Sequence, residues 1–105
     1  MVETIDRLKR ILYVIKNKNN EKCVCIYKNK KIKLSYRQLE CIALMLQGYT
    51  YKQIGTALKI GPRTVSDHLD VIKDKFNCMT KSHLAEVLLW GNVIIGRSKD
   101  HAYLT

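Results

Sequence analysis

Apolar residues recur at helical spacing in five segments of the chain, with polar and charged residues between them. The first segment, residues 4–15, carries apolar side chains on one face and charged side chains on the other, which predicts an amphipathic helix. The other four predicted helices begin near Ser35, Thr50, Pro62 and Lys81 and end near Gly48, Leu58, Phe76 and Trp90. The pattern therefore predicts a mainly helical protein.

The predicted helix starts carry capping signals. Ser35 with Gln38, and Thr50 with Gln53, have the spacing of a capping box, in which the side chains of the two residues each accept a hydrogen bond from the other's backbone N–H. Pro62 suits the first position of a helix, because its missing N–H would have no intrahelical partner there. Short, well-defined helices are therefore expected to follow one another closely.

Residues 23–34 have a different composition. Residues 23–27 are rich in β-prone side chains, a polar turn follows, and residues 32–34 alternate between apolar and polar. A small hairpin fits this pattern, and a short extended linker fits it equally well, because an isolated two-stranded ribbon is only marginally stable. The lysines at positions 28, 30, 31 and 33 either follow a phosphate backbone or are simply solvated.

Residues 50–76 contain a short predicted helix, a four-residue turn at 59–62 and a longer predicted helix. This is the outline of a helix-turn-helix, in which the second helix enters the major groove of DNA with its N-terminal residues at the base edges. Val65, Leu69, Ile72 and Phe76 recur at spacings of four, three and four, which predicts the buried stripe of the longer helix. A recognition helix at about 62–76 is therefore expected.

The run LSYRQLECIALMLQGYTYKQIGTALKIGPRTVSDHLDVIKDKFNCMTKSHL resembles the LuxR-type helix-turn-helix domain. The resemblance covers residues 33–94, and the positions that agree with the family's pattern are Leu34, Ser35, Arg37, Glu40, Gly48, Thr50, Lys52, Ile54, Leu58, Ile60, Thr64, Val65, His68 and Lys75. It implies an all-α fold with a four-helix domain at 34–94. The predicted amphipathic helix and a basic linker precede this domain at 1–33, and a tail follows it at 95–105. It also implies a bacterial, sequence-specific DNA-binding transcriptional regulator that binds an inverted repeat as a dimer.

Two departures from the family's pattern concern glycines. Gly55 stands where alanine is usual, and Gly61 stands where the family has a capping serine. A glycine inside a helix costs about 1 kcal/mol relative to alanine. That cost applies in full unless close helix packing requires Gly55.

The resemblance also implies roles for residues of the motif. Lys52, Thr64 and His68 would contact the DNA backbone, and three further positions, Ser66, Asp67 and Asp70, would face the groove. Arg63 is singled out by its own chemistry, because a cation in the first turn opposes the helix dipole and indicates an anion outside the protein.

The aspartates of the predicted recognition helix conflict with binding to a polyanion. One interpretation is that Asp67 accepts a hydrogen bond from the cytosine N4 amino group and so specifies a C·G pair. The other is that the acids repel the duplex, and that the domain is a protein-interaction module that pairs with a longer relative and binds DNA weakly or not at all. The sequence leaves both open.

The last predicted helix, residues 81–90, has more apolar side chains than one core-facing stripe requires. In the family this helix is the usual dimer contact, so Leu84, Val87 and Leu88 are candidates for a two-fold interface between identical chains. The alternative is that all three belong to the core. The amphipathic helix at 4–15 is a second candidate dimer surface.

The charge, the apolar runs and the motifs of the sequence limit the classes of function that we expect. The formal net charge is +10, and residues 1–33 hold 10 basic and 3 acidic residues, which favours a phosphate-rich partner such as double-stranded DNA. Neither a signal peptide nor an apolar run of membrane-spanning length is visible, so we expect a cytoplasmic protein. The sequence has no Gly-rich phosphate loop and no paired-carboxylate site, so we expect neither an enzyme nor a cofactor or small-molecule substrate.

The four cysteines do not predict a metal site. Their spacing is irregular, and we expect Cys23 and Cys25 to face opposite sides of the predicted strand, where they would not bind one zinc ion. Cys41 and Cys78 fall on apolar positions of the helical pattern and are expected to be small buried side chains. No metal is therefore predicted.

Overall fold

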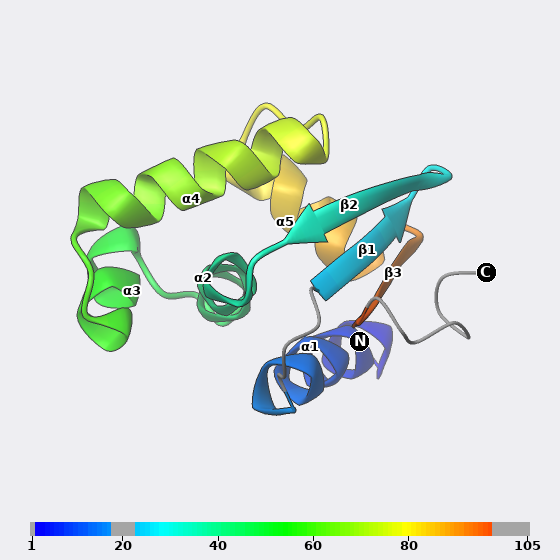
Figure 1. Cartoon of the computed structure of the whole chain (residues 1–105), viewed down its shortest axis with the longest axis horizontal. Coiled ribbons are helices and arrows are strands. Elements are labelled where there is room, and N and C mark those ends of the chain that lie inside the picture. Colours follow the sequence, from blue (N-terminus) through cyan, green and yellow to red (C-terminus); the bar gives the residue numbers. More distant parts are fainter. Residues whose placement is uncertain (1, 18–22, 98–105) are drawn as a thin grey trace.

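The computed structural model of the 105-residue chain describes residues 2–17 and 23–97 (Figure 1). In this part the chain forms five helices and three strands. In chain order they are α1 (Val2–Lys16), β1 (Cys23–Tyr27), β2 (Lys30–Leu34), α2 (Tyr36–Leu46), α3 (Tyr51–Leu58), α4 (Pro62–Lys75), α5 (Lys81–Trp90) and β3 (Val93–Arg97). The five predicted helices are present, with ends that shift by one or two residues.

The strands form one antiparallel sheet in the order β2-β1-β3. Of the two alternatives for residues 23–34, the hairpin is confirmed. Its turn residues Lys28 and Asn29 have φ angles of 51° and 63°, which is the geometry of the two-residue type I′ turn that suits the twist of a hairpin. The third strand makes the hairpin stable, because it adds a second hydrogen-bonded neighbour and an apolar face.

The expectation of an all-α fold is therefore wrong: the protein is mainly helical and carries a small sheet. Sequence reasoning missed β3, and it assigned residues 95–97 to a tail. Val93 and Ile95 are β-branched and lie 5% and 2% exposed, on the face of the sheet that packs on the helices. Their burial against β1 is what makes the last segment a strand.

One hydrophobic core joins the N-terminal helix, the sheet and the helix-turn-helix. It extends from Ile11 and Val14 of α1, through Leu34 of β2 and Leu69 of α4, to Ile95 of β3. Helix α1 packs against α2, α5 and β3. In Figure 1, α2 lies between α1 and α4, so the two outer helices are on opposite sides of the molecule.

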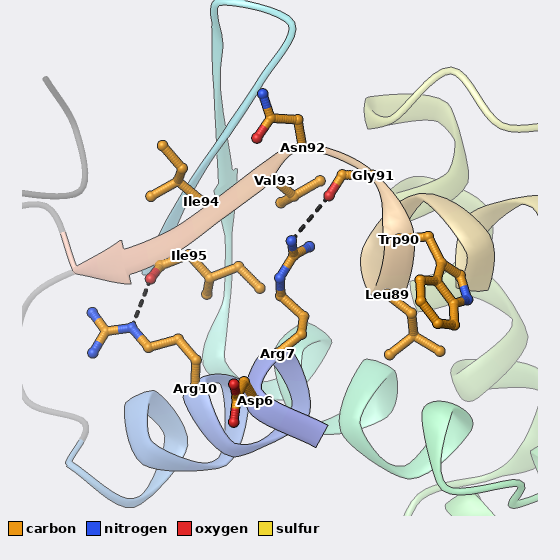
Figure 2. A pocket seen from close by; sticks show the side chains of 10 residues that line it. All are labelled: Asp6, Arg7, Arg10, Leu89, Trp90, Gly91, Asn92, Val93, Ile94 and Ile95. Carbon is orange, nitrogen blue, oxygen red and sulfur yellow. Dashed lines mark hydrogen bonds between the residues drawn. The ribbon is translucent and has the colours of Figure 1, made fainter. Parts of the chain in front are cut away.

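Two arginines of α1 donate hydrogen bonds to backbone carbonyls at the end of α5 and in β3. Arg7 donates hydrogen bonds to the carbonyl oxygens of Leu88 (2.6 Å) and Gly91 (2.9 Å), at the C-terminal end of α5. A guanidinium suits this end, where helix carbonyls have no intrahelical partner and the dipole is negative. Arg10 donates to the Ile95 carbonyl of β3 at 2.9 Å, and Figure 2 shows both arginines beside the open pocket near Trp90.

The predicted caps are present. In the first capping box, Ser35 Oγ accepts from Gln38 N and Gln38 Oε1 accepts from Ser35 N, both at 3.0 Å. Thr50 and Gln53 repeat the arrangement at the start of α3, with distances of 3.2 Å and 2.9 Å. These bonds satisfy N–H groups that a helix start leaves without intrahelical partners.

Gly55 lies where α3 meets the turn before α4. A Cβ atom at this position would lie 2.6 Å from the Ile60 carbonyl oxygen, and the Ile60 N–H donates to the Gly55 carbonyl at 2.9 Å. Lys59 takes the left-handed conformation, with φ 60°, and reverses the chain. The close approach of the turn backbone therefore requires a residue without a side chain at position 55. This close packing is the condition under which the cost of a glycine in the helix is offset.

All four cysteines are buried thiols. The expectation that Cys23 and Cys25 face opposite sides is wrong, because residues two apart in a strand share a face. A hydrogen bond from Cys25 lowers the pKa of Cys23, while the same bond and burial raise the pKa of Cys25 well above its usual range. Within the described ranges, no three His, Cys, Asp or Glu side chains are grouped as metal ligands.

Candidate nucleic-acid interface

Helices α3 and α4 form the helix-turn-helix at one end of the molecule (Figure 1). Helix α4 buries Val65, Leu69 and Ile72, which are 0%, 1% and 0% exposed, and Phe76 continues the stripe just beyond the helix end. The predicted buried stripe is therefore confirmed. At 100° per residue, the opposite side of α4 carries the exposed residues Arg63, Asp67, Asp70 and Asp74, with the exposed Val71 at its edge.

The N-terminal end of α4 is open to solvent. Arg63 and Thr64 lie in its first turn and are exposed, and Pro62 occupies the first helical position as expected. The N-cap residue Gly61 makes no side-chain capping bond. This end of the helix therefore offers N–H groups and the positive end of the helix dipole to an anion.

The remaining predicted contact residues lie on the same two helices. Lys52 is exposed in the first turn of α3. Ser66 and His68 are half-buried on opposite flanks of α4, and Asp67 and Asp70 are exposed between them. The structure thus brings six of the seven predicted DNA-binding residues onto α4 and the seventh onto α3.

Two of the three aspartates on the exposed side of α4 are paired with cations of the same helix. Asp67 lies 3.5 Å from Arg63, and Asp70 lies 3.1 Å from Lys73. The Asp67 and Arg63 side chains are 65% and 91% exposed, so this pair contributes at most about 1 kcal/mol to stability. The pairs nevertheless place a cation beside each of these carboxylates, which reduces the local negative charge.

One flank of α4 carries Thr64, His68, Val71 and Lys75, at spacings of four, three and four. The Lys75 ammonium donates to the Lys33 carbonyl oxygen at 2.6 Å, across 42 residues of sequence. Sequence reasoning missed this contact, since nothing local indicates that β2 lies beside the end of α4. The contact makes the hairpin a continuation of the helix-turn-helix surface.

A second contact that the sequence did not predict joins the starts of α5 and α3. The Lys81 ammonium lies 5.1 Å from the centroid of the Tyr51 ring, in a cation–π geometry. Tyr51 immediately precedes Lys52, so two lysines lie at the start of α3.

The residues proposed for a dimer contact lie in the core. Leu84, Val87 and Leu88 are 0%, 8% and 1% exposed, which corresponds to the alternative that the sequence left open. A second copy of the chain would meet other side chains of α5, because these three are covered within the monomer. Trp90, at 58% exposed, is the largest apolar side chain that α5 leaves accessible.

Comparison with known proteins identifies a family for the part of the chain that contains the helix-turn-helix. A family model described as "Bacterial regulatory proteins, luxR family" matches residues 33–88, which is more than half of the chain. The match runs from the end of β2 into α5 and includes the whole helix-turn-helix. No curated protein and no solved structure matches the sequence. No helix in the described ranges is long and apolar enough to span a bilayer.

Proposed function

The chain belongs to the luxR family of bacterial regulatory proteins, which are DNA-binding transcription regulators, and we propose that it recognises a specific DNA sequence through α4 in the major groove. The observation that carries this proposal is the exposed side of α4. From Arg63 to Asp74 this side is in solvent, while the opposite stripe fixes the helix on the core. A helix held in this way presents the same side chains to every duplex it meets.

We assign the phosphate contacts to residues around the first turn of α4 and the start of α3. Lys52, Arg63 and Thr64 are exposed there and are assigned to phosphate. His68 lies one turn beyond Thr64 along the same flank of α4. Contacts of this kind set the orientation of the protein on the duplex and carry no sequence information themselves.

We assign base recognition to the residues that face outward between the two flanks. Asp67 is the sharpest case, because a carboxylate can accept a hydrogen bond from the cytosine N4 amino group. Arg63 beside it offsets the negative charge that the duplex would otherwise meet. Ser66 and Asp70 are proposed to face neighbouring bases.

Selection of binding sites from a random duplex pool tests the proposal, at near-physiological salt so that purely electrostatic capture is suppressed. We expect a two-fold symmetric motif. Lys52→Ala and Arg63→Ala should weaken binding to every sequence, whereas Asp67→Ala should change the preference at one base pair by about 1–3 kcal/mol. An equal loss on all sequences for Asp67→Ala would contradict base recognition by this residue.

We propose that the protein binds its inverted repeat as a homodimer, with half-sites roughly one helical turn apart. The exposed Trp90 is our candidate contact, in place of the three buried residues of α5. Sedimentation of the wild-type protein and of Trp90→Lys tests this: a dimer that becomes a monomer in the variant supports the contact, and an unchanged distribution contradicts it.

The second candidate function is a protein-interaction module, favoured by the acidic side of α4. Asp74 has no ion pair within 4 Å among the described residues, so this side keeps an uncompensated carboxylate. A folded, dimeric protein that enriches no DNA motif would favour this function over the first.

A further inference from the structure

The β1–β2 hairpin carries four exposed lysines at positions 28, 30, 31 and 33. Two of them share one face of the sheet. Ile32 and Leu34 of β2 are 6% and 2% exposed and face the core, so the alternation of the strand directs Lys31 and Lys33 to the other face. The register pairs Lys31 with Ile26 and Lys33 with Val24, which fixes both positions within a three-stranded sheet.

This pair of lysines lies at the end of the flank of α4 that begins with Thr64 and His68. Lys75 is the last residue of that flank, and its ammonium is hydrogen bonded to the Lys33 carbonyl oxygen. In Figure 1, β2 lies next to the C-terminal part of α4. The surface therefore continues from the helix onto the strand without an intervening element.

The continuous surface has the charge and the length that a phosphate backbone requires. Its polar members are Thr64, His68, Lys75, Lys33 and Lys31, and no carboxylate is among them, whereas the aspartates of α4 follow the neighbouring stripe. From residue 64 to residue 75 the helix rises about 16 Å, and the two β2 positions add about 7 Å. One DNA strand places a phosphate about every 3.4 Å along the duplex axis, so this length spans several phosphates.

We infer that Lys31 and Lys33 of the hairpin, with Lys75, form a second contact to the DNA backbone that extends the one made by Thr64 and His68. The inference rests on the proposed function and adds a binding surface to it. The partner is the phosphate backbone of a duplex held by α4. The contact adds affinity and fixes orientation, and it adds no sequence preference, since phosphates are the same at every base pair.

The hairpin geometry distinguishes this surface from a set of solvated lysines on a flexible linker. The type I′ turn and the pairing with β1 hold the strand in one register. The hydrogen bond of Lys75 also joins this strand to the end of α4. A lysine that is already positioned loses less conformational freedom on binding than one on a linker.

The test measures the salt dependence of DNA affinity for matched charge variants of the full chain. Lys31→Gln/Lys33→Gln removes the proposed contact, and Lys9→Gln/Lys16→Gln removes the same charge from exposed positions on α1, on the side of α2 away from α4 (Figure 1). Dissociation constants are taken between 50 and 200 mM salt on a selected site and on an unrelated duplex. Thermal melting shows that each variant is folded.

Each lost phosphate contact lowers the slope of log K against log salt by about 0.9, so Lys31→Gln/Lys33→Gln should lower it by about 1.8. Over this salt range, the wild-type affinity should fall about 12-fold more than the affinity of the variant. The single variant Lys33→Gln should show about half the slope change. The α1 control should keep the wild-type slope, and the preferred motif should be the same in all four proteins.

Equal slopes for the hairpin variant and the wild type would overturn the inference, and so would an equal change in the α1 control, because net charge alone would then explain the effect. A changed motif in the hairpin variant would also overturn it, since base contacts would be involved. In each of these outcomes the wild-type protein still binds DNA, so the proposed function would stand while the inference fails. A wild-type protein that binds no duplex would instead overturn the proposed function together with this inference.

Discussion

Replacement of Gly55 by alanine tests whether the turn between α3 and α4 depends on the absence of a side chain. Alanine is the better helix former by about 1 kcal/mol, so helix propensity alone predicts that Gly55→Ala stabilises the protein. The structure predicts the opposite. The added Cβ would lie 2.6 Å from the Ile60 carbonyl oxygen and 3.4 Å from backbone atoms of Gly61 and Pro62.

The magnitude follows from the displacement that the contact requires. An ordinary contact begins at 3.4 Å, so the backbone at Ile60 must move by about 0.8 Å. Overpacking of this kind costs about 1–3 kcal/mol, and the movement also disturbs the hydrogen bond from Ile60 N to the Gly55 carbonyl. After the gain of about 1 kcal/mol in helix propensity, the contact alone leaves a loss of about 0–2 kcal/mol, and the weakened hydrogen bond adds about 1 kcal/mol, so we expect a net loss of about 1–3 kcal/mol in the free energy of unfolding.

Urea denaturation measures this loss directly, and thermal melting should show a decrease of at least about 4 °C in Tm for each kcal/mol. DNA affinity should fall as well, because Ile60 and Gly61 lead into the first turn of α4, where Arg63 and Thr64 lie. Thr56→Ala, at an exposed neighbouring position of α3, controls for the effect of the substitution on the helix. A Gly55→Ala protein as stable as the wild type would refute the argument, because propensity would then outweigh the contact.

Two further predictions use the same kinds of measurement. Gly61→Ser should raise the free energy of unfolding by about 0.3 kcal/mol, because no atom lies within 4 Å of its Cβ position and the serine hydroxyl supplies the capping acceptor that α4 lacks. The gain is only a few tenths because glycine is itself a good N-cap residue, and a less stable variant in urea denaturation would contradict the prediction. Burial raises the pKa of Cys41 and Cys78, so these thiols stay protonated at a pH where the unfolded thiols ionise, and stability should fall as pH rises above about 8.5. Under reducing conditions, Cys41→Ala/Cys78→Ala should show a weaker fall between pH 7.5 and 9.5, and an unchanged pH dependence would count against this cause.

Local features of the chain were predicted well because their causes lie within a few residues. Each capping box joins residues three apart, and both are present as expected. The buried stripe of α4 follows from a repeat that any α-helix imposes, and Val65, Leu69 and Ile72 are buried as predicted. The seven residues proposed for DNA binding lie on α3 and α4 for the same reason, although their contacts with DNA stay predictions.

The errors arose where one segment depends on a distant one. Residues 93–97 are β-prone, but they become β3 only by pairing with β1, some 70 residues earlier in the chain. The rotation of α5 also depends on packing against other elements, so the sequence left open whether Leu84, Val87 and Leu88 lie in the core or on the surface, and the structure places them in the core. The error on Cys23 and Cys25 has a different origin, since the period of a strand already places them on one face.

The sequence by itself determined the helix-turn-helix, its caps, its buried stripe and its family, because a helix forms from contacts within one turn and the motif's spacing is written along the chain. Only the tertiary structure decided that α1 and the sheet share the core of that motif, that Arg7 closes the end of α5, and that Lys75 holds the lysine-bearing strand against α4. The two hydrogen bonds join residues 81 and 42 positions apart, and the geometry of all these contacts depends on how the whole core packs. The surface that α4 and β2 share therefore becomes visible only in the folded chain.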